Sequence, residues 1–206
     1  SSINKVIMNF LSIDCSTDLN SLFIKHQSKT YSKTLQSDKS NYDLLMKHIL
    51  DFFSKNNLKL EDINEIFVNQ GPGSFSGLRS SISVAKGISL SKNLNLYGYN
   101  TFIWSCSSFF DKKDFIYCFI KSREKYYIKT FNKNLIDISK VEAISKEEIL
   151  NNYENKFIPK NMAKYFDEKI LSLSDLKVID LDHKELEFLK LKGLLDKDLI
   201  KPLYLS

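Results

Sequence analysis

The residues best suited to chemistry lie in one glycine-rich segment, Gln70–Arg79. It reads Gln-Gly-Pro-Gly-Ser-Phe-Ser-Gly-Leu-Arg and contains three of the six glycines in the chain. An apolar run typical of a strand, residues 66–68, precedes it, and a pattern typical of a helix follows it as far as Leu90. Glycine lets other groups approach the backbone closely, and the first amides of a helix carry partial positive charge. The segment therefore has the character of a site for an anion or for another chain.

Two familiar phosphate loops do not fit this segment. A Walker A loop needs a lysine directly after its last glycine, but Leu78 and Arg79 follow Gly77. A dinucleotide-binding loop needs a third glycine where Ser76 stands, and an acidic residue about 20 residues later. No Asp or Glu occurs between residues 66 and 110, so the acidic partner of the ribose is missing. We therefore predict neither kind of nucleotide site here.

The second candidate is the turn that follows the first predicted strand, Asn9–Ile13. Asp14 ends that strand, and Ser16 lies in the turn. A carboxylate in this place could hold a phosphate-bound metal, while the structural alternative is a turn closed by the Asp side chain. Both interpretations stay open at this point. The residues that could form a vestigial phosphate site are Asp14, Ser16, Gly71, Gly73, Ser74 and Gly77.

Other patterns of catalytic or metal-binding residues are missing from the sequence. The three histidines are far apart and form no HxxxH or HExxH pair, so we predict no metal site and no catalytic residue. No Gly-x-Ser-x-Gly motif surrounds Ser74 or Ser76, so a serine nucleophile is not expected. The three cysteines match no zinc or redox spacing, and they favour buried thiols in a reducing compartment, which indicates the cytoplasm.

Composition and charge favour an ordinary globular protein. Of the 206 residues, 43% are hydrophobic, and the net charge of +5 is a weak preference for anionic partners. No apolar run approaches the roughly 20 residues of a membrane-spanning helix, so we expect no membrane contact. Residues 1–7 precede Met8 and are left out of the predicted fold.

Strand and helix patterns alternate along the first half of the chain. The first three strands are expected to form an antiparallel meander. The expected order is strands Asn9–Ile13, Leu19–His26 and Thr30–Gln36, helix Ser40–Lys55, strand Ile66–Asn69, helix Phe75–Leu90, strand Leu96–Tyr99 and helix Thr101–Phe109.

A shortened form of this pattern follows in the second half. It predicts an α/β fold with mixed sheets in two lobes, over residues 8–106 and 107–206, and the final segment of the chain is expected to pack back on the first lobe. The expected elements are a hairpin of Phe115–Ile120 and Lys125–Phe131, a strand Ile136–Val141, a helix Ser145–Tyr153, a strand Phe157–Ile158 and a helix Lys184–Leu194.

The helix expected over Ser40–Lys55 is apolar on more sides than one sheet can cover. Leu44 and Leu50 widen its apolar stripe beyond a single face. Burial inside one domain and contact with a partner chain explain this pattern equally well. The helix expected over Phe75–Leu90 carries many small residues, which let another helix approach closely.

Several segments resemble the TsaB (YeaZ) family. Phe10–Thr17 resembles the family's opening strand and turn, ILAIDTST, and Asn69–Gly87 resembles its GPGSFTGLR…AKGL signature. Tyr97–Phe102 is similar to a GVST-type strand and helix start, and Pro202–Leu205 is similar to the PxYLR tail. The resemblance is specific and clustered over residues 9–104.

Two departures lie outside these motifs. Lys121-Ser122-Arg123 stands where the family often has Asp-Ala-Arg, so any role of that aspartate is lost here. Lys39 stands near the place of a histidine that is common before the first long helix.

The resemblance implies an actin-like (ASKHA, RNase H-like) fold and a place in making N6-threonylcarbamoyladenosine at position 37 of tRNAs that read ANN codons. In that family the TsaD subunit holds the metal through an HxxxH motif and performs the transfer, and TsaB is its paralogue without the motif. The resemblance also implies a TsaD-like partner that docks on the first two long helices, and self-association through the same surface when the partner is missing. It leaves open a TsaE-like ATPase in the complex and a nucleotide at the partner interface.

We therefore predict a non-catalytic, cytoplasmic subunit that binds and activates a TsaD-like threonylcarbamoyltransferase, reaches tRNA through the complex and has no cofactor of its own. The alternative is an actin-fold ATP-dependent phosphotransferase that uses Asp14 and the Gly71–Gly77 loop. The predicted partner surface comprises Tyr42, Leu45, Met46, Ile49, Phe53, Leu78, Arg79, Ile82 and Lys86.

Overall fold

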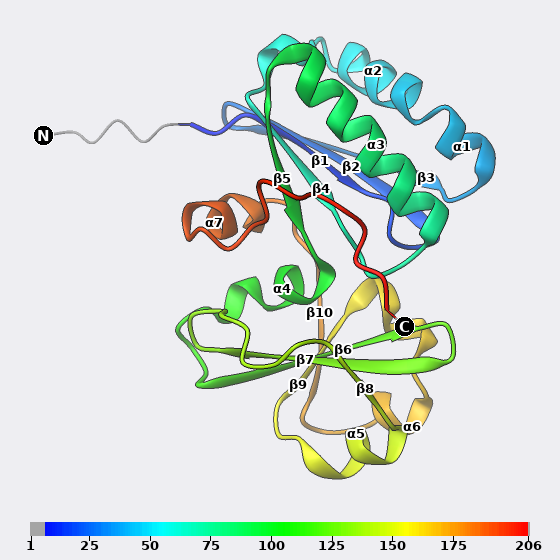
Figure 1. Ribbon diagram of the computed structural model, residues 1–206, viewed down its shortest axis with the longest axis vertical. Coiled ribbons are helices and arrows are strands. Elements are labelled where there is room, and N and C mark those ends of the chain that lie inside the picture. Colours follow the sequence, from blue (N-terminus) through cyan, green and yellow to red (C-terminus); the bar gives the residue numbers. More distant parts are fainter. Residues whose placement is uncertain (1–6, 206) are drawn as a thin grey trace, which may run out of the picture. The chain divides into compact units, whose positions relative to one another are not determined.

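A computed structural model describes residues 7–205 (Figure 1). Most of the segment before Met8, residues 1–6, and the terminal Ser206 lie outside the described residues. Within the described part of the chain, no helix is both long and apolar enough to cross a membrane.

Contacts divide the chain into two compact units. The first unit extends to Tyr99 and also takes in Leu195–Tyr204, while the second unit takes in Asn100–Leu194. This division precedes the boundary that the sequence indicates after Cys106. The reason is that helix α4 (Thr101–Cys106) packs on strands of the second unit.

Three antiparallel strands begin the first unit, and this confirms the predicted meander. Strand β1 (Phe10–Asp14) pairs with β2 (Leu19–His26), which pairs with β3 (Lys29–Gln36). On the other side of β1, the parallel strands β4 (Glu65–Asn69) and β5 (Asn95–Tyr99) complete the order β3-β2-β1-β4-β5. Because β1 and β4 are parallel neighbours, their carboxyl ends bring two polar residues, the last of each strand, to one edge of the sheet.

Helices cover one face of this sheet (Figure 1). They are α1 (Lys39–Asp43), α2 (Leu45–Lys55) and α3 (Phe75–Lys92), and a short 3₁₀ helix, Leu60–Asp62, follows α2. The buried side chains of α2, α3 and the 3₁₀ helix pack with the apolar residues of β1, β2 and β4 into one core.

The prediction of a single helix over Ser40–Lys55 is wrong, because the chain leaves the helical backbone at Leu44. That residue has φ −103° and ψ 13°. Next to the break, Ser80 Oγ donates a hydrogen bond of 3.0 Å to the carbonyl of Tyr42. This bond from α3 competes with the intrahelical bond that a continuous helix needs from the same carbonyl.

The second unit has its own five-stranded sheet, in the order β10-β9-β6-β7-β8. The predicted hairpin is confirmed as antiparallel β6 and β7, and helix α5 begins at the Ser145 cap, where Ser145 Oγ accepts from the amide of Glu148. The elements are β6 (Phe115–Ser122), β7 (Lys125–Asn132), β8 (Glu142–Ile144), α5 (Lys146–Asn152), β9 (Lys156–Pro159), α6 (Glu168–Leu171), β10 (Leu176–Ile179) and α7 (Glu185–Leu191), with 3₁₀ helices at Ser107–Phe109 and Lys160–Tyr165.

The strand predicted over Ile136–Val141 is wrong, and β8 forms directly after it. The side chain of Asn132 accepts hydrogen bonds from the amides of Asn134 and Ile136 at 2.9 and 3.1 Å. Leu135 adopts a positive φ of 58° between them. These local bonds make a turn that reverses the chain. The segment then pairs with β7 only through the isolated bridge Phe131–Asp137, and a regular strand forms at Glu142–Ile144.

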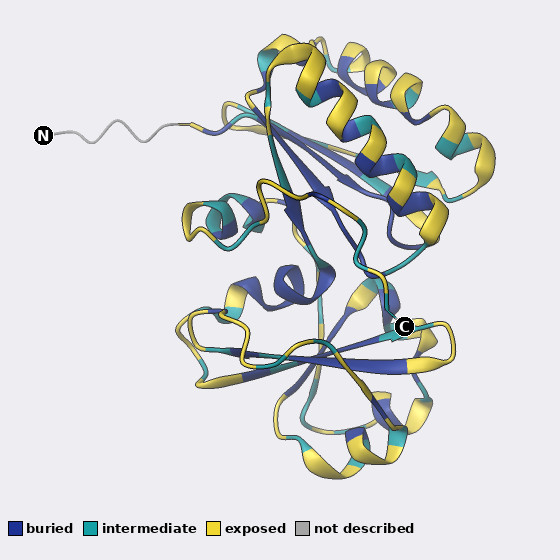
Figure 2. Ribbon diagram, in the orientation of Figure 1, coloured by how far each residue is buried: buried dark blue, intermediate teal, exposed yellow. Residues whose placement is uncertain are grey.

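Burial follows this layering in each unit. Strands β1, β4 and β9 are fully buried, the edge strands β3 and β10 have no buried residue, and the outward sides of α2 and α3 are largely exposed (Figure 2). The structure is therefore an α/β fold with two mixed sheets, as the sequence predicts.

Candidate functional site

The glycine-rich segment of the first unit closes directly onto the turn that follows β1. The amide of Ser74 donates a hydrogen bond of 2.9 Å to the carbonyl of Ser16. A Cβ atom at Gly73 would overlap that same carbonyl, and a Cβ atom at Gly77 would overlap the carbonyl of Cys15. These two glycines therefore allow backbone to pack on backbone, and protein atoms fill the space beside them.

The C-terminal tail contacts the beginning of the same segment. The amide of Leu203 donates to the carbonyl of Gln70 at 2.7 Å, and Gln70 Nε2 donates to the carbonyl of Lys201 at 3.0 Å. Gly71 has a φ of 105°, which favours glycine, and a Cβ atom there would meet the side chain of Leu78. The loop is thus held between the β1 turn and the tail of its own chain.

Asp14 is buried, with 3% of its surface exposed, and it closes the turn with its side chain. Its Oδ1 accepts hydrogen bonds from Ser16 N at 3.0 Å, Ser16 Oγ at 2.6 Å and Asn69 Nδ2 at 3.1 Å. Burial raises the pKa of the Asp14 carboxyl, and these three hydrogen bonds oppose the rise only in part. The geometry favours the turn-closing interpretation of Asp14 over a metal-binding one.

Replacing Asp14 by asparagine is expected to stabilise the protein at neutral pH. Because the folded-state pKa lies above the ordinary value of 3.8, the stabilising contribution is complete below that value and is lost as the pH rises through the folded-state pKa. Asparagine keeps the accepting oxygen without the charge, so we expect the Asp14→Asn variant to be more stable than the wild type at pH 7 and not in acid. Urea unfolding at both pH values measures this. A less stable variant at pH 7 would show that the ionised carboxylate is required.

Asn69 and Tyr99 complete this polar cluster, and sequence reasoning missed both. Asn69 ends β4, and its Oδ1 accepts from the amide of Gly71 at 2.8 Å, so it links Asp14 to the glycine loop. The hydroxyl of the fully buried Tyr99 hydrogen-bonds to Ser12 Oγ at 3.0 Å. The available signal was a polar residue at the end of an apolar strand, and two such strands lie next to each other here.

Among the described residues, no three His, Cys, Asp or Glu side chains gather as a metal ion would need. The cluster around Asp14 consists of a single carboxylate with amide and hydroxyl groups, and a donor set of this kind suits hydrogen bonding within the protein better than cation binding.

The predicted partner surface divides into buried and exposed residues. The helices turn their more apolar stripe toward their own sheet, and this side is not available to a partner. Five predicted residues are each at most 4% exposed and pack inside the first unit: Leu45, Ile49, Phe53, Leu78 and Ile82.

Three large apolar side chains at the break and along α2 are exposed. Leu44 and Leu50 are each 44% exposed and Met46 is 37% exposed, and we call these three residues the α1–α2 apolar surface. A groove of about 720 Å³ adjoins it, and Met46, Leu50 and Lys92 are among its lining residues. Two residues of the predicted partner surface, Met46 and Phe53, line this groove.

The remaining three predicted residues lie at or near the surface. The hydroxyl of the half-buried Tyr42 hydrogen-bonds with Ser37 and with Ser74 Oγ, so Tyr42 also supports the cap of α3. Arg79 and Lys86 are exposed on α3. The Arg79 guanidinium lies 5.1 Å from the ring centre of Phe75, in a cation–π contact.

Sequence similarity to known proteins covers part of this chain. Residues 37–119 match the family model of TsaD, tRNA N6-adenosine threonylcarbamoyltransferase. The tRNA threonylcarbamoyladenosine biosynthesis protein TsaB of Buchnera aphidicola subsp. Baizongia pistaciae is 34% identical over 89 residues, which are 43% of this chain and 40% of that protein. TsaB of Escherichia coli K12 is 27% identical over 94 residues, 46% of this chain and 41% of that protein. The chain thus spans about two fifths of these curated relatives.

Similarity of structure extends over nearly the whole chain. YeaZ from Pseudomonas aeruginosa superposes with a TM-score of 0.71 at 16% identity, covering 97% of this chain and 100% of that one. The ethanolamine utilization protein EutJ from Carboxydothermus hydrogenoformans gives a TM-score of 0.53 at 11% identity over 89% of this chain and 88% of its own. At these identities the likeness shows the fold, and it confirms the predicted actin-like class.

The matched residues 37–119 include the glycine-rich segment that packs on the β1 turn. Over part of its length this chain is therefore similar in sequence to TsaB proteins, and it shares the fold of YeaZ.

Proposed function

We propose that this chain is the non-catalytic subunit that binds and activates a TsaD-like threonylcarbamoyltransferase. The complex would form N6-threonylcarbamoyladenosine at position 37 of ANN-reading tRNAs. The observation that carries the proposal is the α1–α2 apolar surface, Leu44, Met46 and Leu50, which the core of the first unit leaves exposed. The names of the TsaB relatives support it, as does the family model that matches the segment containing this surface.

An exposed apolar stripe on a helix pair is best explained by a second protein. On α2, Met46 and Leu50 are one helical turn apart, so they form a continuous ridge. Exposed single apolar residues are normal, but a ridge with an adjoining groove marks an interaction site. Such ridges pack into the grooves of a partner helix.

The alternative, an ATP-dependent phosphotransferase, has less support from the geometry. It needs amides of the Gly71–Gly77 loop for phosphate, but Ser74 N donates to Ser16 and Gly71 N donates to Asn69 Oδ1. It also needs Asp14 to bind a metal, whereas Asp14 Oδ1 already accepts three hydrogen bonds. We therefore assign the loop a structural role, setting the start of α3.

Substituting Leu50 by glutamate is expected to abolish co-purification with the TsaD-like subunit from the same organism. Leu50 is exposed, so the charge leaves the fold intact, but in the complex it would be buried without a partner. A matched control is Ile138→Glu in the second unit, where the side chain is 50% exposed and outside the proposed surface. Affinity capture of the co-expressed pair, followed by size exclusion, measures the association.

Two results would contradict this assignment. One is a Leu50→Glu variant that stays bound as tightly as the wild type. The other is an equal loss of co-purification for the Ile138→Glu variant, which would point to general instability. Ile49→Glu cannot serve for this test, because Ile49 is fully buried and its substitution should unfold the first unit.

The wider assembly belongs to the same proposal. Without its partner, the chain would form a homodimer through the α1–α2 apolar surface, since a two-fold contact can bury the same patch on both copies. A TsaE-like ATPase and tRNA would join through the complex. The place of action would be the cytoplasm, where the three buried free cysteines stay reduced.

A further inference from the structure

One face of the second unit's sheet carries aromatic rings beyond the helices that cover it. On β6, side chains alternate, so Phe115, Tyr117 and Phe119 share a face. Phe119 lies in the core, and the half-buried Tyr117 packs against Tyr153 with ring centres 5.1 Å apart. Phe115, at the start of the strand, is 57% exposed. The uncovered end of the sheet therefore offers two neighbouring rings.

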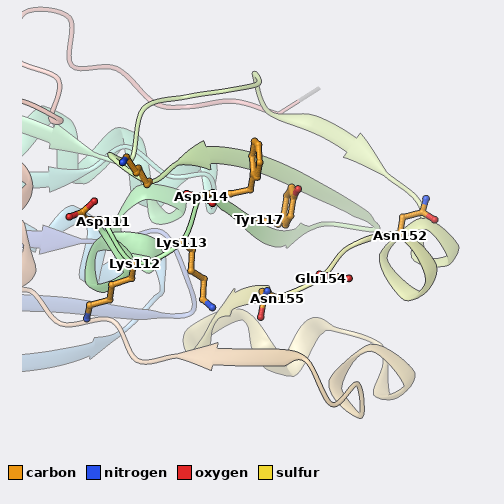
Figure 3. A pocket seen from close by; sticks show the side chains of 10 residues that line it. Asp111, Lys112, Lys113, Asp114, Tyr117, Asn152, Glu154 and Asn155 are labelled. Carbon is orange, nitrogen blue, oxygen red and sulfur yellow. The ribbon is translucent and has the colours of Figure 1, made fainter.

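A polar groove of about 760 Å³ surrounds these rings. Lysines of the loop before β6 lie on one side of the groove, and the residues that follow α5 lie on the other (Figure 3). The polar lining consists of Lys112, Lys113, Lys133, Asn152, Asn155 and three carboxylates. Within residues 7–205, the three lysines take part in none of the ion pairs formed.

We propose that this groove binds single-stranded RNA, with unpaired bases stacking on Phe115 and Tyr117 and with Lys112 and Lys113 contacting the backbone. Unpaired bases stack on aromatic side chains of exposed sheet faces, and lysines beside them neutralise phosphates. The proposal rests on the proposed function, which makes a tRNA the substrate and its anticodon loop the source of unpaired bases.

The composition of the groove argues against a protein occupant. Eight of its ten lining residues are Lys, Asp, Glu or Asn, and Lys, Asp and Glu are depleted in protein–protein contacts. Asp111, Asp114 and Glu154 balance the three lysines, so attraction of phosphate alone is weak here. These carboxylates can accept hydrogen bonds from the amino groups of bases, and affinity should therefore depend on unpaired bases more than on charge.

The test measures binding of the full chain to a fluorescent anticodon stem–loop RNA by anisotropy. Phe115→Ala should weaken binding about tenfold or more, and Phe115→Trp should restore it, because stacking on one ring accounts for a change of that size. Lys112→Ala with Lys113→Ala should lower the slope of log affinity against log salt concentration by about 1.4, since each phosphate contact to a single strand contributes about 0.7. A fully paired RNA of the same stem should bind the wild type more weakly.

The matched control is Tyr165→Ala, which removes an exposed ring with a nearby lysine in the same unit but outside the groove. It should leave RNA affinity unchanged, and unchanged fluorescence of Trp104 verifies that each variant folds. Equal affinity of wild type and Phe115→Ala overturns the inference, as does equal loss for Tyr165→Ala. If Phe115→Ala instead releases the TsaD-like subunit, the face binds protein and the inference fails. The proposed function is tested separately, by whether the Leu50→Glu variant still co-purifies with the TsaD-like subunit. Failure of the RNA-binding inference therefore does not decide the proposed function.

Discussion

Gly73→Ala is expected to lower the free energy of unfolding by about 4 kcal/mol or to prevent folding. The added Cβ would overlap the carbonyl of Ser16, and its neighbours there are all backbone atoms. A side chain could rotate away, but backbone held by the Ser74–Ser16 hydrogen bond cannot. The loop would have to separate from the β1 turn and expose the Asp14 cluster. Urea unfolding followed by far-UV circular dichroism measures the change.

Gly87→Ala is the matched control for this prediction. Gly87 lies in α3, and no atom lies within 4 Å of the place where its Cβ would be. Alanine should therefore stabilise the helix by about 0.5 to 1 kcal/mol. Opposite signs at two glycines 14 positions apart in one chain segment would separate backbone packing from helix propensity. If Gly73→Ala were as stable as the wild type, the loop would have room for a bound phosphate, and its structural role would be wrong.

Acidification is expected to destabilise the second unit through His183. Burial lowers the pKa of this imidazole from 6.5 to about 3. The unfolded chain therefore binds a proton between these values that the folded chain does not, so stability falls as the pH decreases from 6.5 toward 3. The difference between the unfolded and folded pKa values corresponds to about 5 kcal/mol in the free energy of unfolding. About 3 kcal/mol of this is lost by pH 4.

Trp104 provides the measurement and His183→Gln the comparison. The Trp104 ring lies 4.8 Å from the imidazole, and its Nε1 donates to the carbonyl of Asp182 at 2.8 Å, so fluorescence of the single tryptophan reports on this contact. Carboxylates also titrate in this range, and the variant separates their effect. At pH 4 the stability lost relative to pH 7 should be about 3 kcal/mol smaller for His183→Gln than for the wild type. Equal losses would show that His183 is protonated in the folded state.

Local patterns in the sequence were enough for most strands and for two of the features that define the family. The meander β1–β3 and the hairpin β6–β7 follow from alternation and turn residues over a few positions. The glycine-rich segment and Asp14 could be identified as a cluster because both follow predicted strands. The role of the glycine-rich segment could not be predicted from the sequence. A phosphate-binding loop and a loop packed on neighbouring backbone both need glycine, for the same steric reason.

The hydrogen-bond partners of the buried polar groups come from distant segments of the chain. Asn69 reaches Asp14 from 55 positions away, and the tail reaches Gln70 from more than 130. No pattern within one segment predicts such pairs, because the pairing of β1 with β4 and the return of the tail are decided by the packing of the whole unit.

The sequence alone shows that Ser40–Lys55 has more apolar residues than one helix face needs. It could not assign Ile49 to the core and Leu50 to the surface, because both stripes of the helix are apolar. The assignment depends on how α2 is rotated against its sheet, and the packing of the first unit's core decides that rotation. Burial is a property of the packed unit, since the free energy of removing apolar surface from water is set by what covers it and not by the residue that carries it.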